Sequence, residues 1–241
     1  MKNILKVASM ALVLSLTLFG ITNKASAAKL TLYCSVEIDV CEMLEQAYEK
    51  ETGTKVAMTR ASSGETFAKI KAEASNPKGD VWFGGTGDPH LTAAQENLTE
   101  KYKSVHFNDL LPAAQNQAKN ADFKSVGIYV GALGFGYNKD LLAKKGLPAP
   151  KSWMDLTKPI YKGEIQVANP NSSGTAYTTL ATILQIFGED KGWDYMKKLH
   201  ANINTYTKSG SAPIKATGRG ENLIGICFQH DGVKQTKKGL P

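Results

Sequence analysis

The stretch LTLYCSVEIDVCEMLEQAYEKETGTKVAMTRASSG, residues 30–64, decides the fold class, because its side-chain periodicity switches from that of a strand to that of a helix and back. Thr52-Gly53 supplies a stop signal between the helical and the second β-rich part. The same order continues downstream and ends in a glycine turn. We predict a strand over 30–35, a helix over 37–51, a strand over 55–59, a helix over 64–74 and a strand over 80–84.

This β-α-β-α-β order predicts a mostly parallel sheet with helices on both faces, an α/β fold. In such sheets, ligands bind outside the carboxyl ends of the strands. Three loops follow predicted strands there: Cys34-Ser35, Arg60–Gly64 and Gly84–His90. Each places small or hydroxyl residues ahead of a helix, where free backbone N–H groups can bind an anion.

A second unit follows the glycine-punctuated stretch VGIYVGALGFGYN, residues 126–138, which we expect to cross between two lobes as extended chain. Its predicted elements are helices over 141–145, 176–187, 192–201 and 212–220, with strands over 164–168 and 223–228. The predicted domains are an N-terminal lobe with crossover over 28–132, a C-terminal lobe over 133–225 and a return crossover over 226–241. The Leu240-Pro241 end suggests a chain truncated before a further C-terminal part.

The first 27 residues are typical of a cleaved secretory signal: lysines, then an uncharged apolar run, then Ala25-Ser26-Ala27. A membrane anchor is the alternative, although the run is shorter than the roughly 20 residues that a span requires. We therefore expect a soluble exported protein in the periplasm. Removing the three lysines of this segment lowers the net charge from +7 to +4. Lysine and arginine are not clustered, which argues against nucleic-acid binding and leaves small anions as partners.

The chain has three cysteines. In an oxidising compartment Cys34 and Cys41 can form a disulfide, and metal ligation is the alternative. Neither a histidine nor a further cysteine lies near them in sequence to complete a metal site. Cys227 lies within an apolar run and is expected to be a buried small hydrophobe.

The most suggestive candidate site is Asn169–Thr175, a hydroxyl-rich turn between a strand and an apolar helix. Plain helix capping by Ser172 or Ser173 is the alternative. The first lobe has similar hydroxyl-rich helix starts at Ser62–Gly64 and at Gly84–Thr86. We therefore predict that both lobes close on one oxyanion, a phosphate or a carboxylate, with Ser173 and Thr175 among its ligands.

Enzymatic alternatives have weaker support in the sequence. No Gly-Lys-Ser/Thr follows the glycines, and no Gly-x-Ser-x-Gly occurs. We interpret His90 as a helix-start residue. His230-Asp231, directly after the strand over 223–228, is predicted to hydrogen-bond the neutral end of a polyol or sugar, with helix capping by Asp231 as the alternative. Acid–base hydrolysis by this pair ranks lowest, because no nucleophile or metal set accompanies it.

Several motifs together resemble the solute-binding components of bacterial ABC importers labelled as iron(III) transporters, in particular a group that binds hexose phosphates. They include the stretches at 32–60 and 62–98, VGIYVGALGFGYN, ANPNSSGTAYTTLA at 168–181, the stretch at 199–221 and His230-Asp231. The resemblance implies a monomeric two-lobed periplasmic binding protein of type II fold, without cofactor or enzymatic activity, which closes on its solute and delivers it to a membrane permease. It further implies that His230 and Asp231 contact sugar hydroxyls, and that phosphate is bound by Ser62, Ser63, Thr86, Ser172, Gly174 and Thr175.

Ferric-iron binding is the alternative function. Ferric-binding relatives typically use adjacent tyrosines near the second crossover, but this chain has no Tyr-Tyr pair and has His230-Asp231 about where one is expected. Serine and threonine hydroxyls are poor substitutes for tyrosinate oxygens as ferric ligands. Iron held through a captured anion with His230, Asp231 or Glu37 stays open as an alternative.

Overall fold

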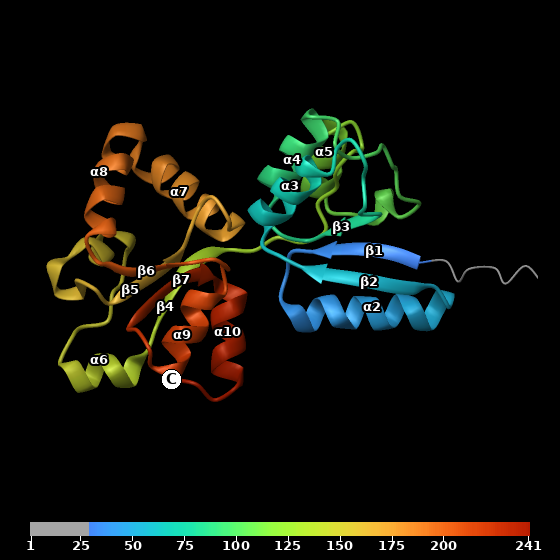
Figure 1. Cartoon of the computed structure of the whole chain (residues 1–241). Coiled ribbons are helices and arrows are strands. Elements are labelled where there is room, and N and C mark those ends of the chain that lie inside the picture. Colours follow the sequence, from blue (N-terminus) through green and yellow to red (C-terminus); the bar gives the residue numbers. More distant parts are fainter. Residues whose placement is uncertain (1–28) are drawn as a thin grey trace, which may run out of the picture.

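The computed structural model describes residues 29–241, so the predicted signal segment lies outside the described residues. Two α/β lobes lie side by side, joined by extended chain (Figure 1). None of the helices in residues 29–241 is long and apolar enough to cross a bilayer.

The N-terminal lobe is built on a three-stranded parallel sheet with strand order β2-β1-β3. Helix α2 covers one face of this sheet, and α3, α4 and α5 lie on the other (Figure 1). The predicted β-α-β-α-β order is thus present. The elements are β1 Lys29–Cys34, α2 Ile38–Thr52, β2 Lys55–Arg60, α3 Ser63–Ala72, β3 Val81–Phe83, α4 Gly87–Gln95, η1 Phe107–Asp109 and α5 Pro112–Asn120.

The C-terminal lobe has a four-stranded sheet with order β4-β7-β5-β6, in which only β4 runs antiparallel to its neighbour. Helices α7 and α8 lie on one side of this sheet, and α9 and α10 on the other (Figure 1). The elements are β4 Leu133–Tyr137, α6 Lys139–Lys145, η2 Trp153–Thr157, η3 Pro159–Tyr161, β5 Ile165–Ala168, α7 Gly174–Phe187, α8 Glu189–His200, β6 Ile203–Thr207, α9 Ala212–Arg219, β7 Ile224–Phe228 and α10 Gln229–Lys237.

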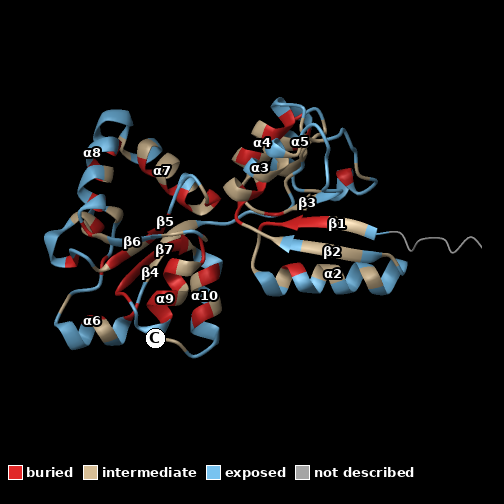
Figure 2. Cartoon of the chain, in the orientation of Figure 1, coloured by how far each residue is buried: buried red, intermediate tan, exposed pale blue. Residues whose placement is uncertain are grey.

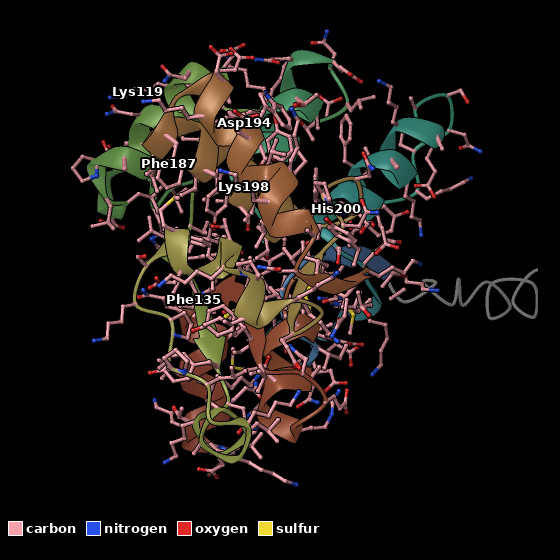
Figure 3. The ribbon with its side chains drawn as sticks, turned by 90° about the vertical axis from the view of Figure 1, so that its left-hand side faces the viewer. Lys119, Phe135, Phe187, Asp194, Lys198 and His200 are labelled. Atoms are coloured by element: carbon pink, nitrogen blue, oxygen red, sulfur yellow. A yellow bond between two sulfur atoms is a disulfide. The ribbon has the colours of Figure 1, made fainter. Side chains whose placement is uncertain are left out.

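The larger hydrophobic core belongs to the C-terminal lobe and centres on β5 and β7, as the buried segments in Figure 2 show. Ile165, Ile224 and Ile226 are fully buried in it. Charged side chains such as Asp194 and Lys198 lie along the outer helix α8 instead (Figure 3). Burial of the strands and exposure of the helix surfaces explain why the periodicity of the sequence predicted these elements.

The sequence analysis missed β6 and α5, gave no range for the helix that it expected after Gly84–His90, and assigned residues 226–241 to a return crossover. In the structure β7 pairs with β4 and β5, and α10 packs on α9 and β4, so residues 224–237 lie with the C-terminal lobe. The physical reason for this difference is that the apolar strand β7 is buried between β4 and β5, and α10 begins directly after it. Residues 126–132 are extended without sheet pairing and connect the lobes.

Cys34 at the end of β1 and Cys41 in the first turns of α2 are joined by a disulfide, and both are completely buried. Cys227 is a buried free thiol in β7, and burial raises its pKa to about 12. The disulfide therefore anchors the loop from Ser35 to Glu37, which leads into the interlobe cleft.

We expect replacement of both Cys34 and Cys41 by alanine to lower the free energy of unfolding by about 2–3 kcal/mol, because the closed loop of the unfolded chain is short. Chemical denaturation of the oxidised protein and of this variant measures the difference. Cys227→Ala is the control for loss of a buried sulfur. Equal stability of the oxidised protein and the double variant would contradict a stabilising role.

Candidate anion-binding site between the lobes

The lobes are in direct contact through the loops that the sequence analysis singled out. The backbone N–H of Gly64 donates to the carbonyl oxygen of Ser172 across the interface, with an N···O distance of 3.1 Å. A Cβ placed on Gly174 would lie only 2.1 Å from Oγ1 of Thr86. The structure thus brings the helix starts of α3, α4 and α7 together at one point of the cleft.

Two of the predicted hydroxyl ligands already donate to the backbone of the C-terminal lobe, Ser62 from across the interface and Ser172 from within the same lobe. The hydroxyl groups of Ser62 and Ser172 both donate to the carbonyl oxygen of Lys208, at 3.4 and 3.0 Å. Ser62 is also the N-cap residue of α3, and its N–H donates to the Glu65 carboxylate. A hydroxyl has one hydrogen to donate, so in this arrangement neither serine has a hydrogen left for an anion.

Four other predicted hydroxyls keep their hydrogens free among the described residues. Ser63 Oγ accepts from the N–H of Thr86 at 3.3 Å and can still donate. Thr86 Oγ1 is buried without a partner. Ser173 occupies the N-cap position of α7 but makes no side-chain capping bond, and it is 2% exposed. Thr175 follows one residue inside the same helix. This pattern favours ligand binding over capping alone.

A fourth hydroxyl-rich loop, at 209–211 before α9, belongs to the same cluster and was missed from the sequence. A Cβ placed on Gly210 would lie 2.1 Å from Oγ1 of Thr175 and 2.9 Å from Oγ of Ser173. Arg60 donates to Oγ of Ser209 at 3.2 Å and brings a guanidinium group to the cleft. The signal was available, since Ser-Gly-Ser before a helix repeats the pattern used for the other loops.

The second part of the site is the pair His230-Asp231 at the start of α10. The Asp231 side chain is 9% exposed, and no group within residues 29–241 donates a hydrogen bond to its carboxylate. Burial raises the pKa of Asp231, and the carboxylate of Glu37 adds to this effect, whereas His230, Lys215 and Lys234 oppose it. A buried acceptor without a donor is well suited to bind hydroxyl groups of a solute.

His90 is neither in the hydroxyl cluster nor beside Asp231. It lies in the first turn of α4, stacks on Trp82 with ring centroids 3.6 Å apart, and donates from Nε2 to the Gly84 carbonyl at 2.8 Å. Burial lowers its pKa and so favours the neutral ring. His90 therefore supports the glycine loop, in agreement with its predicted place at a helix start.

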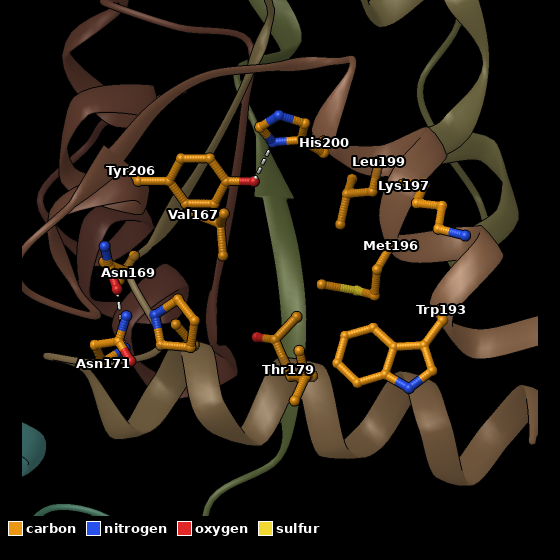
Figure 4. A pocket seen from close by; sticks show the side chains of 14 residues that line it. Val167, Asn169, Asn171, Thr179, Trp193, Met196, Lys197, Leu199, His200 and Tyr206 are labelled. Atoms are coloured by element: carbon orange, nitrogen blue, oxygen red, sulfur yellow. Dashed lines mark hydrogen bonds between the residues drawn. The ribbon is translucent and has the colours of Figure 1, made fainter. Parts of the chain in front are cut away.

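Two hollows lie near this cluster. One, of about 210 Å³, is formed by both lobes at the edge of the Gly64 and Gly174 contact, and Phe67 and Tyr177 line it. The other, of about 440 Å³, lies within the C-terminal lobe between α7, α8 and β6 (Figure 4). It is mainly apolar, and His200 and Tyr206 are hydrogen-bonded to each other at its rim (Figure 4). The hydroxyl cluster is not part of the larger hollow.

Within residues 29–241, three ion pairs cross the interface, and in each the acid belongs to the N-terminal lobe and the lysine to the C-terminal lobe. The pairs are Glu37 with Lys215, Asp39 with Lys234 and Glu65 with Lys208. Burial of Glu37 would raise its pKa, but hydrogen bonds from Lys215 and Ser211 outweigh this effect and lower it. The facing surfaces of the two lobes are therefore electrostatically complementary. Among the described residues, no cluster of three or more histidine, cysteine or acidic side chains could hold a metal ion.

Comparisons with known proteins agree with this geometry. Residues 81–238 match the pattern described as bacterial extracellular solute-binding protein. The chain is 43% identical over 238 residues to an uncharacterized protein of Haemophilus influenzae. The aligned region covers 98% of this chain and 68% of that protein. It is similar to the periplasmic binding protein AfuA from Actinobacillus pleuropneumoniae with exogenous fructose-6-phosphate bound, with 45% identity, a TM-score of 0.87 and coverage of 90% of this chain and 68% of AfuA.

A more distant match concerns the fold alone. Iron-bound HitA from Pseudomonas aeruginosa is 21% identical, with a TM-score of 0.71 over 88% of this chain and 66% of HitA. These matches confirm the α/β fold of type II periplasmic binding proteins that the resemblance implied.

The ion pairs across the interface predict that closure of the lobes depends on charge. Reversing Lys208, Lys215 and Lys234 to glutamate places like charges opposite one another, so we expect the lobes to separate and the radius of gyration in small-angle X-ray scattering to increase. The control reverses three lysines that are paired within a lobe, Lys55, Lys71 and Lys145. An equal radius of gyration for the two triple variants would contradict this prediction.

Proposed function

This chain belongs to the family of bacterial extracellular solute-binding proteins, and we propose that it captures a small phosphorylated solute, specifically a sugar phosphate, by closure of its two lobes. In this proposal the family role, delivery of a solute to an ABC permease in the inner membrane, applies to this chain as well. Export through the N-terminal segment and a periplasmic location are part of the same proposal.

The single observation that carries the proposal is the convergence of four free hydroxyl donors from both lobes at three helix starts. Ser63, Thr86, Ser173 and Thr175 retain hydrogens to donate, and the loops place glycines where backbone N–H groups can approach a ligand closely. The partial positive charge at the helix starts favours an anion there. Because the donors come from both lobes, a bound phosphate would itself stabilise the closed form.

The other end of the solute is assigned to His230 and Asp231. The buried Asp231 carboxylate lacks donors, so hydroxyl groups of a sugar would satisfy it. His230 is half exposed, beside Asp231 at 3.8 Å, and both of its ring nitrogens can take part in hydrogen bonds. This arrangement would distinguish a sugar phosphate from inorganic phosphate, and AfuA, bound to fructose-6-phosphate in its structure, supports the solute class.

Ferric-ion binding, the alternative drawn from the resemblance, has no specific observation in its favour. Glu37, one of its suggested ligands, is hydrogen-bonded to Lys215. Loading the purified protein with ferric iron and recording its visible absorption is a direct test. A coloured stoichiometric complex, together with no binding of sugar phosphates, would favour iron over the proposed function.

The phosphate assignment predicts that replacing Ser173 by alanine and Thr175 by valine weakens binding of glucose 6-phosphate at least tenfold, about 1.4 kcal/mol. Isothermal titration calorimetry measures this affinity. Ser172→Ala is the matched control, because it is the same chemical change at a hydroxyl that donates to Lys208. The control should lose less affinity than the double variant. The assignment of donors is wrong if Ser172→Ala has the larger effect.

The sugar assignment predicts that Asp231→Asn lowers the affinity for glucose 6-phosphate about tenfold and leaves that for inorganic phosphate unchanged or slightly higher. Removing a negative charge should by itself strengthen anion binding, so a loss would identify Asp231 as an acceptor for hydroxyl groups. The same titrations with both ligands provide the measurement. Tighter binding of both ligands by the variant would exclude this role.

A further inference from the structure

The glycine loop at residues 84–86 contains Thr86, one of the proposed phosphate donors. Its two glycines have backbone conformations that other residues rarely adopt. Gly84 and Gly85 have φ angles of 77° and 93°, in the region that favours glycine. A Cβ placed on Gly84 would lie 2.4 Å from Cγ1 of Val36, and one on Gly85 would lie 2.3 Å from Oγ of Ser63. The loop lies outside any helix or strand, so its position depends on its hydrogen bonds to neighbouring side chains.

One side chain, Tyr129, holds both polar backbone groups of Gly85. The phenol hydroxyl donates to the carbonyl oxygen of Gly85 and accepts from its N–H, each with a distance of 2.8 Å. The ordinary pKa of a tyrosine, about 10, lies well above neutral pH, so the phenol keeps the proton that it donates. Loss of this one oxygen would leave the N–H and the carbonyl oxygen of Gly85 to bind water instead of a fixed protein group, because the contact is exposed to solvent.

The opposite side of the loop is fixed to the N-terminal lobe itself. The Gly84 carbonyl accepts from His90, and the N–H of Thr86 donates to Oγ of Ser63. These two contacts come from helices α3 and α4, which belong to the same lobe as the loop. Tyr129 is different, because it comes from the extended segment that connects the lobes.

The connecting segment also touches the other end of the candidate site. A Cβ placed on Gly131 would lie 3.3 Å from the ring of His230, and the Ala132 carbonyl accepts from the N–H of Gln229 at 2.8 Å. Within four residues, the segment thus contacts the glycine loop through Tyr129 and the start of α10 through Gly131 and Ala132. Rotation of the lobes about this segment would change both contacts together.

We propose that Tyr129 is a positioning residue through which the interlobe segment holds the Gly84–Thr86 loop in its binding conformation and so couples closure to the placement of the Thr86 hydroxyl. The coupling to solute binding rests on the proposed function, because it assumes that Thr86 contacts the phosphate. The mechanical part, that Tyr129 fixes the loop, does not depend on the solute.

The mechanical part is tested by Tyr129→Phe, which removes only the phenol oxygen. We expect the Gly85 amide of the ligand-free variant to exchange its hydrogen at least about tenfold faster than in the original protein. Tyr102→Phe is the control, because the Tyr102 side chain is 72% exposed and is distant from the loop in sequence. Unchanged exchange at Gly85 in Tyr129→Phe would overturn the proposal, whatever the protein binds.

The coupling is tested by titrating glucose 6-phosphate into Tyr129→Phe, Thr86→Val and the double variant. We expect each single change to weaken binding about tenfold and the second change to add little to the first, because Tyr129 acts through Thr86. Additive losses would show that Tyr129 acts independently of Thr86 and would overturn the coupling. Absence of binding by the original protein would refute the proposed function and the coupling, while hydrogen exchange would still decide whether Tyr129 fixes the loop.

Discussion

Three glycines, Gly85, Gly174 and Gly210, stand where a β-carbon would overlap a hydroxyl oxygen of a neighbouring loop. The resulting close approach of loops determines the rest of the cleft. It brings the starts of α3, α4, α7 and α9 to one place, so that hydroxyls from both lobes lie close together, as the proposed anion site requires. Any larger residue at these positions would separate the loops, and the hydroxyl cluster would no longer be formed by both lobes together.

Charge complementarity across the interface also favours one relative placement of the lobes. The acids of the interlobe ion pairs lie on the N-terminal lobe and the lysines on the C-terminal lobe, so the two surfaces attract each other. The range of this attraction shortens as the salt concentration rises. Individually the more exposed of these pairs, Asp39 with Lys234 and Glu65 with Lys208, are weak. Their common orientation matters more, because it favours one relative placement of the lobes and disfavours shifted ones.

The hydroxyl groups divide into two kinds that the residue types alone do not distinguish. Ser62 and Ser172 both donate to the Lys208 carbonyl of the C-terminal lobe, whereas Thr86 Oγ1 is buried with no partner among residues 29–241. A buried hydroxyl without a partner is costly in an empty protein and becomes favourable when a ligand accepts its hydrogen. The division therefore separates hydroxyls whose hydrogen is already used within the protein from hydroxyls that are available to a solute.

From the sequence alone, the alternation of strand and helix patterns determined the α/β class, and the hydroxyl-glycine runs before helices identified Ser63, Thr86, Ser173 and Thr175 as candidates. These signals are local, because periodicity and helix starts are properties of neighbouring residues. Only the tertiary structure showed that the loop at 209–211 joins this cluster, that Arg60 contacts Ser209 and that Tyr129 contacts Gly85, and it alone gave the strand over 224–228 its neighbours β4 and β5. Their roles depend on contacts between residues up to 149 positions apart, such as Arg60 with Ser209, and no local pattern encodes which loops meet when two lobes close.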